Sequence, residues 1–338
     1  MHKKCVNYTQ INVAVIGLGS YGKALVQRLV DSGLYKIKYC VHKQRKKADE
    51  FAALFNSVGC EDYANVLVDP GVDAVFVVTP HDSHFELAKH ALEAQKHVFL
   101  EKPMTNTISE AKELGQLVEE SQKVLMIGHN YRRKNGIRFI KQLQEDGKIG
   151  RPVHLEMVIS HGGAFNFPKD SWRNNPQKCF GGPLSMLGSH SFEVLQYLLG
   201  KPLSVYSINH CLQSLSTCDD STISLLQMKC GATAILTHHY IVPSLSYLRI
   251  EGTEGTATYE VDSNKVVFLT GRDENCIPAP CHTYSLKPND DRLEQVIEFA
   301  GAINRGIEVE TDFSSAYSVV EFIEKSMQSS MSKKVVFF

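Results

Sequence analysis

The first third of the chain alternates between short apolar runs and segments whose apolar residues recur at helical spacing. The run Val75–Val78 is apolar at every position, which is typical of a strand buried on both faces. Strands separated by single helices indicate βαβ units, and therefore an α/β fold built on a parallel sheet. Strands are expected at residues 11–16, 36–41, 73–78, 97–100 and 124–127, and helices at 21–31, 46–56, 83–94 and 109–121.

Beyond about residue 130, strand follows strand with short turns between them, which predicts an α+β domain with a large, mostly antiparallel sheet. No low-complexity linker separates the two patterns. We therefore assign residues 9–130 to the first domain and residues 131–338 to the second. In the second domain, strands are expected at residues 152–160, 203–213, 222–228, 232–241, 246–251, 256–260 and 265–269, and helices at 134–146, 188–199, 290–305 and 313–330.

The composition of the 338-residue chain is that of a globular protein of about two domains, with 43% hydrophobic and 22% charged residues. The formal net charge of −1 gives no field that would favour nucleic acid. No apolar stretch approaches the roughly 20 residues needed to span a bilayer, and residues 1–10 lack the apolar core of a secretory signal. Nine cysteines without a C-x-x-C pair indicate reduced thiols, so we expect a cytoplasmic protein without a bound metal.

The first apolar strand ends in Gly17-Leu18-Gly19-Ser20-Tyr21-Gly22, a G-x-G-x-x-G turn that is followed at once by a helical pattern. In a dinucleotide-binding turn, the first glycine allows the tight turn and the second lets a diphosphate approach the backbone. The third lets helix and strand pack closely. The helix N-terminus adds N–H groups and a positive dipole end. In this setting the motif predicts a Rossmann-type, doubly wound domain that binds a dinucleotide through residues 17–22.

The residues after the second strand bear on which dinucleotide binds. NAD-selective domains commonly place an acidic residue about 20 positions beyond the glycines, where it bonds the ribose 2′-hydroxyl. This segment instead reads His42-Lys43-Gln44-Arg45-Lys46-Lys47 and holds no carboxylate. His42, Lys43 and Arg45 are therefore candidates to bind the 2′-phosphate of NADP(H), with NAD(H) as the second choice. The alternative interpretation is the solvated start of a basic helix.

Two motifs lie at the carboxyl ends of expected strands, at the same edge of the predicted sheet. Thr79-Pro80-His81-Asp82-Ser83-His84 follows the strand at 73–78, and Lys96–Pro103 contains the strand at 97–100 and ends in Glu101-Lys102-Pro103. Sheets of this kind bind their ligands beyond the carboxyl ends of the strands. A lysine held between an acid and a proline at such a place is poorly explained by packing, so Lys102 is a candidate for chemistry. The alternative is a strand-ending turn with a solvated lysine.

Three motifs, T-P-x-x-x-H at 79–84, K-H-V-x-x-E-K-P at 96–103 and G-H-N-Y-R at 128–132, carry a family resemblance. They resemble those of the glucose-fructose oxidoreductase, inositol 2-dehydrogenase and rhizopine-catabolism (Gfo/Idh/MocA) family of NAD(P)-dependent oxidoreductases. Residues 180–190 resemble that family's G-G-x-x-x-D-x-G-x-H segment, and residues 250–255 its G-T-x-G turn. The resemblance implies hydride transfer between a nicotinamide cofactor and a secondary alcohol or ketone of a sugar, cyclitol or related polyol.

The resemblance also implies roles for individual residues. Lys102 matches the lysine that contacts the reacting oxygen, and His190 matches the histidine that acts as general acid and base or binds the substrate. Family members form dimers or tetramers through the second-domain sheet, so we expect a homodimer or homotetramer. Positions beside the cofactor are matched by Thr79, Pro80, His84 and Glu101, and positions beside the substrate by Asn130, Arg132, Trp172 and Arg173.

Met186 stands where the family often has an aspartate, four residues before His190. A thioether cannot hold a proton or orient a sugar hydroxyl, so the pair typical of sugar-oxidising members is incomplete. Glu193 either shares a helical face with His190 or is an exposed helix residue. Three alternatives stay open. Lys102 and His190 suffice, the substrate is a non-sugar compound such as a dihydrodiol, or the chain is a cofactor-binding regulator without catalysis.

Overall fold

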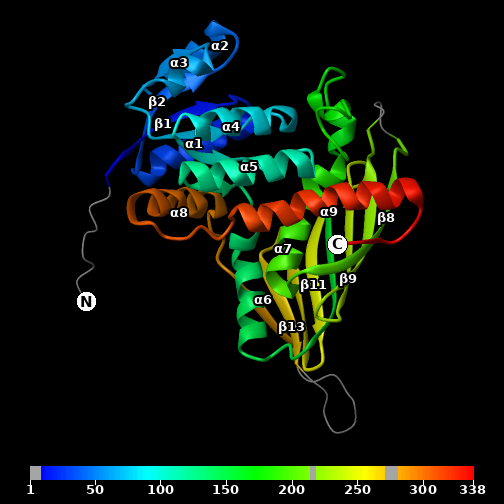
Figure 1. Ribbon diagram of the computed structural model, residues 1–338. Coiled ribbons are helices and arrows are strands. Elements are labelled where there is room, and N and C mark those ends of the chain that lie inside the picture. Colours follow the sequence, from blue (N-terminus) through cyan, green and yellow to red (C-terminus); the bar gives the residue numbers. More distant parts are fainter. Residues whose placement is uncertain (1–8, 214–217, 271–280) are drawn as a thin grey trace, which may run out of the picture. The chain divides into compact units, whose positions relative to one another are not determined.

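The computed structural model describes residues 9–213, 218–270 and 281–338, and it divides into two compact units. The first unit runs to Gly128 and includes Asp291–Tyr317, whereas the second comprises His129–Asp290 and Ser318–Phe338. The sequence-based assignment placed every residue beyond 130 in the second domain. The structure differs from it at residues 291–317, which pack with the first unit. Each unit is built on one sheet (Figure 1).

The first unit holds a six-stranded, all-parallel sheet in the order β3-β2-β1-β4-β5-β6. This is the order of a doubly wound sheet, so the predicted Rossmann-type α/β fold is confirmed. Its strands are β1 (Ile11–Ile16), β2 (Tyr35–Val41), β3 (Val58–Cys60), β4 (Ala74–Val77), β5 (His97–Leu100) and β6 (Leu125–Ile127). The helices between them are α1 (Ser20–Ser32), α2 (Arg45–Ala53), α3 (Tyr63–Leu67), α4 (His84–Glu93) and α5 (Ile108–Ser121).

Two short elements of this unit, β3 and α3, were not expected from the sequence. Strand β3 has three residues with Gly59 at its centre, and α3 has five residues, so neither is long enough to show a period. The longer α5 was expected, and its start is fixed by a capping box in which Thr107 and Glu110 each accept from the other's backbone N–H. The length of each helix or strand therefore decided whether the sequence pattern could reveal it.

Helix α8 (Asp291–Arg305) completes the core of the first unit from far along the chain. The Phe299 ring packs edge-on against Phe76 of β4, with 5.4 Å between ring centroids, and lies 5.8 Å from Phe99 of β5. Beyond the helix, the Ile127 N–H donates to the Thr311 carbonyl (3.0 Å) at the end of β6. Helical periodicity predicts an apolar face but not the sheet on which that face packs, so the sequence did not place α8 correctly.

The second unit holds a nine-stranded sheet in the order β14-β13-β12-β11-β7-β10-β9-β8-β15. All neighbouring strands are antiparallel except β10 and β7, which confirms the predicted mostly antiparallel sheet. The strands are β7 (Pro152–Ser160), β8 (Pro202–His210), β9 (Ser221–Met228), β10 (Thr233–His239), β11 (Leu245–Gly252), β12 (Gly255–Glu260), β13 (Lys265–Thr270), β14 (Cys281–Ser285) and β15 (Val336–Phe337).

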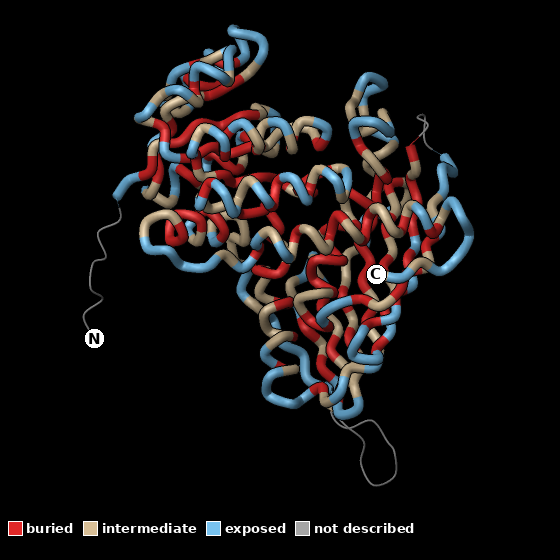
Figure 2. Tube along the Cα trace, viewed as in Figure 1, coloured by how far each residue is buried: buried red, intermediate tan, exposed pale blue. Residues whose placement is uncertain are grey.

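Helices α6 (Asn135–Glu145) and α7 (Ser189–Leu199) cover one face of this sheet, as Figure 1 shows. Buried residues gather between these helices and the strands (Figure 2). Phe192 of α7 stacks on Phe322 of α9 (Phe313–Ser332), with ring centroids 4.3 Å apart. Strands β14 and β15 were not expected, because β14 is exposed throughout and β15 has only two residues. Within the described ranges, no helix is both long and apolar enough to cross a bilayer.

Candidate active site

The glycine turn between β1 and α1 has the space that a bound diphosphate requires. Gly17 has φ of +103°, and a Cβ there would lie 2.3 Å from the Val78 carbonyl oxygen. A Cβ at Gly22 would lie 2.2 Å from the Gly17 carbonyl oxygen, so the helix can approach the strand only without a side chain. A Cβ at Gly19 meets no described atom within 4 Å, which leaves the backbone open on that side.

Helix α1 begins at Ser20 directly behind this open backbone. Gly19 is the N-cap residue, and among the described residues no side chain caps the helix and no acidic residue lies in its first turn. The first N–H groups and the positive dipole end of α1 are therefore suited to stabilise an anion at this turn. The turn fits the diphosphate of a dinucleotide.

The residues after β2 surround the start of α2. The Gln44 N–H donates to His42 Nδ1 (3.0 Å), and Lys43 is exposed. Arg45 contacts both carboxylate oxygens of Asp49 (2.9 and 2.8 Å), and its backbone N–H donates to Glu61 Oε1 (2.9 Å). Glu61 follows β3, so the folded chain adds to the local Asp49 a second carboxylate from a strand end distant in the sequence.

His84 ties together the loops that follow β4 and β5. Its ring is fully buried, and its two nitrogens face the backbone carbonyl oxygens of Pro103 (2.7 Å) and Thr79 (2.9 Å). Burial lowers the pKa of His84. His84 therefore joins the Thr79-Pro80 loop to the Lys102 loop, and it does not present its ring at the surface where a cofactor would lie.

Lys102 lies on the loop after β5 at the same carboxyl edge as the glycine turn. Its side chain is partly exposed, whereas the preceding Glu101 is buried. The Lys102 N–H donates to Glu101 Oε2 (3.3 Å). The Rossmann unit thus carries the open glycine turn and a partly exposed lysine along one edge of one sheet, which is where such sheets bind ligands.

In the second unit, His190 follows a π-helical turn, η5 (Leu184–Gly188), at the start of α7. Turns of this kind occur frequently at functional sites. The imidazole of His190 stacks on the Tyr131 ring, with centroids 4.2 Å apart and planes 24° from parallel. His190 and Met186 are both partly exposed. Tyr131 was not singled out as a site residue, although it lies within the G-H-N-Y-R motif.

Glu193 is fully buried, and its carboxylate is ion-paired with the Arg132 guanidinium. Of the two alternatives for Glu193, exposure on the helix is therefore wrong. Arg132 is also buried, and its guanidinium lies 4.9 Å from the Tyr197 ring centroid. The pair joins η2 (Tyr131–Arg133) to α7, which carry Tyr131 and His190, and Asn130 directly before η2 is also buried.

Trp172 and Arg173 lie together on η4 (Trp172–Asn174), in the long connection after β7. The Arg173 guanidinium stands 4.6 Å from the Trp172 ring centroid and 5.5 Å from that of Phe167. Phe167 in turn packs edge-on against the buried Tyr240. The loop is therefore held together by cation–π and ring–ring contacts, and Arg173 stands close to both Trp172 and Phe167.

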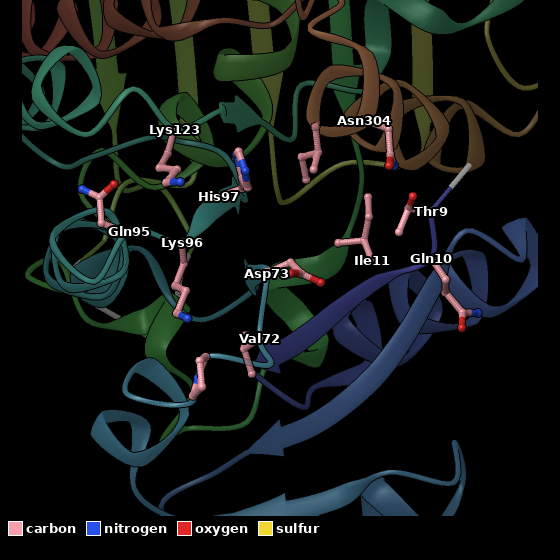
Figure 3. Close-up of a pocket in the computed structure, with 12 residues that line it drawn as sticks. Thr9, Gln10, Ile11, Val72, Asp73, Gln95, Lys96, His97, Lys123 and Asn304 are labelled. Carbon is pink, nitrogen blue, oxygen red and sulfur yellow. The ribbon is translucent and has the colours of Figure 1, made fainter. Parts of the chain in front are cut away.

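A separate cavity of about 300 Å³ lies at the amino ends of β1, β4 and β5, the opposite end from the glycine turn. Figure 3 shows Asp73, Lys96 and His97 around it. These side chains already have partners, because Asp73 accepts from the Asn12 N–H (2.8 Å), Lys96 donates to the Asp69 carbonyl (2.9 Å) and His97 accepts from the Val124 N–H (3.0 Å). This cavity is not the candidate active site. Across the described residues, no three His, Cys, Asp or Glu side chains group as a metal site would.

Comparison with known families matches both units. A sequence model described as the oxidoreductase family with an NAD-binding Rossmann fold matches residues 11–129. A second, described as the GFO/IDH/MocA C-terminal domain, matches residues 137–258. The two matches together span more than half of the chain.

Individual relatives agree with these matches. The scyllo-inositol 2-dehydrogenase (NAD⁺) of Bacillus subtilis is 28% identical over 258 residues, covering 73% of each chain. A Desulfitobacterium hafniense structure, named as a proposed NADPH-dependent oxidoreductase, is similar with a TM-score of 0.92 at 23% identity over 98% of each chain. Levoglucosan dehydrogenase in complex with NADH is similar with a TM-score of 0.88 at 22% identity, over 97% of this chain and 99% of that one.

Proposed function

The chain belongs to the Gfo/Idh/MocA family of oxidoreductases, and from this premise we propose that it transfers hydride between a nicotinamide cofactor and a secondary alcohol or ketone of a sugar, cyclitol or related polyol. One observation carries the proposal. The open glycine turn, with the uncapped start of α1, and the partly exposed Lys102 lie along the same edge of one sheet. The relatives named for inositol and levoglucosan oxidation support the substrate class. We place the enzyme in the cytoplasm.

In the proposed reaction, Gly17, Gly19 and the first N–H groups of α1 would hold the diphosphate of the cofactor, with Thr79 and Pro80 beside it. When bound, the nicotinamide would supply or accept the hydride. The Lys102 ammonium polarises the substrate carbonyl and stabilises negative charge on its oxygen. His190 exchanges the hydroxyl proton, with its ring held flat against Tyr131. Trp172, Arg173 and Asn130 bind or frame the substrate.

The test follows the absorbance of NADH and NADPH, which should appear when NAD⁺ or NADP⁺ is mixed with polyols, cyclitols or aldoses that are oxidised. It should disappear when the reduced cofactors are mixed with the corresponding ketones. Turnover of at least one member supports the proposal. Cofactor binding without turnover of any member contradicts the polyol reaction.

Met186 favours a second candidate, a cofactor-binding regulator. A thioether on η5 provides no proton acceptor four residues before His190. Under this alternative, the purified protein binds nicotinamide cofactor and changes its association with a protein partner, yet it turns over no substrate. A panel extended to dihydrodiols and other non-sugar alcohols distinguishes this from a reductase with a different substrate.

We propose that NADP(H) is favoured over NAD(H), because four of the six residues 42–47 are cationic. Glu61 opposes this preference, since its carboxylate lies at the start of α2 beside Arg45. We expect NADPH to bind about tenfold more tightly than NADH, and Glu61→Gln to tighten NADPH binding about threefold further by removing a repulsive charge. Fluorescence titration measures both constants, with the exposed Glu120→Gln as the control. Tighter binding of NADH by tenfold would make this prediction wrong.

We propose that the chain forms a homodimer or homotetramer through the face of the second sheet that lies opposite α6 and α7. That face carries the exposed apolar residues Ile208, Ile223 and Leu225 on the paired strands β8 and β9. A contiguous apolar patch of this kind marks interaction surfaces. We expect light scattering to give the mass of two or four chains, and Ile223→Lys with Leu225→Glu to give one. The exposed Val68→Glu, in the first unit, should leave the mass unchanged.

A further inference from the structure

Glu101 is a buried acid at the point where the elements of the candidate cofactor site meet. It follows β5 directly, and only 7% of the residue is exposed. Its carboxyl group lies against the backbone of Gly128 beyond β6, where a Cβ would come within 2.6 Å of Oε1. Gly128 therefore makes room for this carboxyl group.

The carboxyl group contacts two parts of the candidate site at once. Oε2 accepts from the Lys102 N–H (3.3 Å), and the Tyr21 side chain hydrogen-bonds the carboxyl group from the first turn of α1. Oε1 has no hydrogen-bond partner among the described residues. One acid therefore links the glycine turn to the lysine loop and keeps an unsatisfied oxygen.

The titratable and charged groups around Glu101 come from three parts of the first unit. Tyr21 faces it from α1, Lys102 from its own loop and Arg292 from α8, with Asp291 of α8 acting on Tyr21. The Arg292 guanidinium lies 5.0 Å from the Tyr21 ring centroid. Burial raises the pKa of Glu101 to about 7, although Lys102, Tyr21 and Arg292 each favour its ionised form. Glu101 therefore changes charge near neutral pH.

We propose that Glu101 is a positioning residue that couples the glycine turn to the Lys102 loop through one proton, so that binding of the anionic dinucleotide is accompanied by proton uptake at its carboxyl group. A diphosphate at the N-terminus of α1 adds negative charge beside Tyr21, and this charge disfavours a second negative charge on Glu101. Protonated Glu101 then also carries an O–H donor close to the Lys102 backbone. The inference rests on the proposed dinucleotide binding.

The test is the pH dependence of NADH and NADPH dissociation constants, measured by fluorescence with no substrate present. For the wild-type protein we expect the dissociation constant to rise about three- to tenfold from pH 6 to pH 8, because the cofactor-bound form holds the proton to higher pH. Glu101→Gln cannot ionise, so its constant should change less than twofold. Glu120→Gln, an exposed acid on α5, should follow the wild-type curve.

A second variant keeps the proposal testable if Glu101→Gln does not fold. Tyr21→Phe removes a hydrogen bond that favours the carboxylate, so its pH curve should keep the wild-type shape but move to higher pH. The cofactor-free proteins give a further measurement. Glu101 costs stability as pH rises from about 4.5 to 7, because its carboxylate is buried, so the melting temperature of Glu101→Gln relative to wild type should rise across this range.

The outcomes separate this inference from the proposed function. An unchanged pH dependence in Glu101→Gln, or an unmoved curve in Tyr21→Phe, overturns the role of Glu101 while cofactor binding stands. Failure of the wild-type protein to bind either cofactor at any pH overturns both.

Discussion

Replacing Lys102 by alanine should lower turnover at least about a hundredfold, which is the low end of the loss expected when a group that stabilises developing negative charge is removed. The reason is that Lys102 is the proposed cation beside the reacting oxygen, on the loop that His84 ties to the neighbouring strand end. The measurement is steady-state turnover with any member of the polyol panel that the wild-type protein converts.

Lys112→Ala is the matched control, because Lys112 is an exposed lysine on α5 of the same unit. Its turnover should equal that of the wild-type protein. A Lys102→Ala protein that binds cofactor normally and retains more than about a tenth of wild-type turnover would exclude an electrostatic role in the transition state.

Replacing Glu193 by alanine should lower the free energy of unfolding by about 3–5 kcal/mol, because the Arg132 guanidinium would stay buried without its counter-ion. The loss should also reach the candidate site, since the pair joins η2 to α7 and so holds Tyr131 against His190. Chemical denaturation measures the stability, and turnover of the surviving folded protein measures the effect on the site.

Two further variants separate the buried charge from other causes. Glu321→Ala removes a partly exposed carboxylate that pairs with Lys325 one helical turn away, so it should cost less than about 1 kcal/mol. Exchanging both buried partners, Arg132→Met with Glu193→Leu, should restore much of the stability lost by Glu193→Ala, because no uncompensated charge then remains. If the double variant were less stable than Glu193→Ala, packing rather than charge would determine the contribution of the Arg132–Glu193 pair to stability.

Local features of the first unit could be predicted from the sequence because they depend on neighbouring residues. A strand, three glycines and a helix within residues 11–25 define the turn, and the structure shows a positive φ at Gly17, open space at Gly19 and close packing at Gly22. The short β3 and α3 were not predicted, because a hydrophobic period can be recognised only in a longer segment.

Features that depend on residues far apart in the chain could not be predicted. The carboxylate at the start of α2 belongs to Glu61, 16 residues beyond Arg45 and on another strand end. His84 was expected beside the cofactor, but its ring nitrogens are taken up by the carbonyls of two loops. The burial of Glu193 depends on Arg132, 61 residues earlier. Helical spacing alone could not distinguish a paired acid from a solvated one.

The return of α8 to the first unit has a consequence for how the chain is made. Phe76 and Phe99 are synthesised early, but their covering residue Phe299 leaves the ribosome only after nearly all of the second unit. The hydrophobic core of the first unit therefore cannot be completed until residues 129–290, which belong to the second unit, have been translated. A fragment ending at residue 130 would expose those aromatic rings to water, so the two halves of this enzyme cannot be produced as independent modules by a single cut.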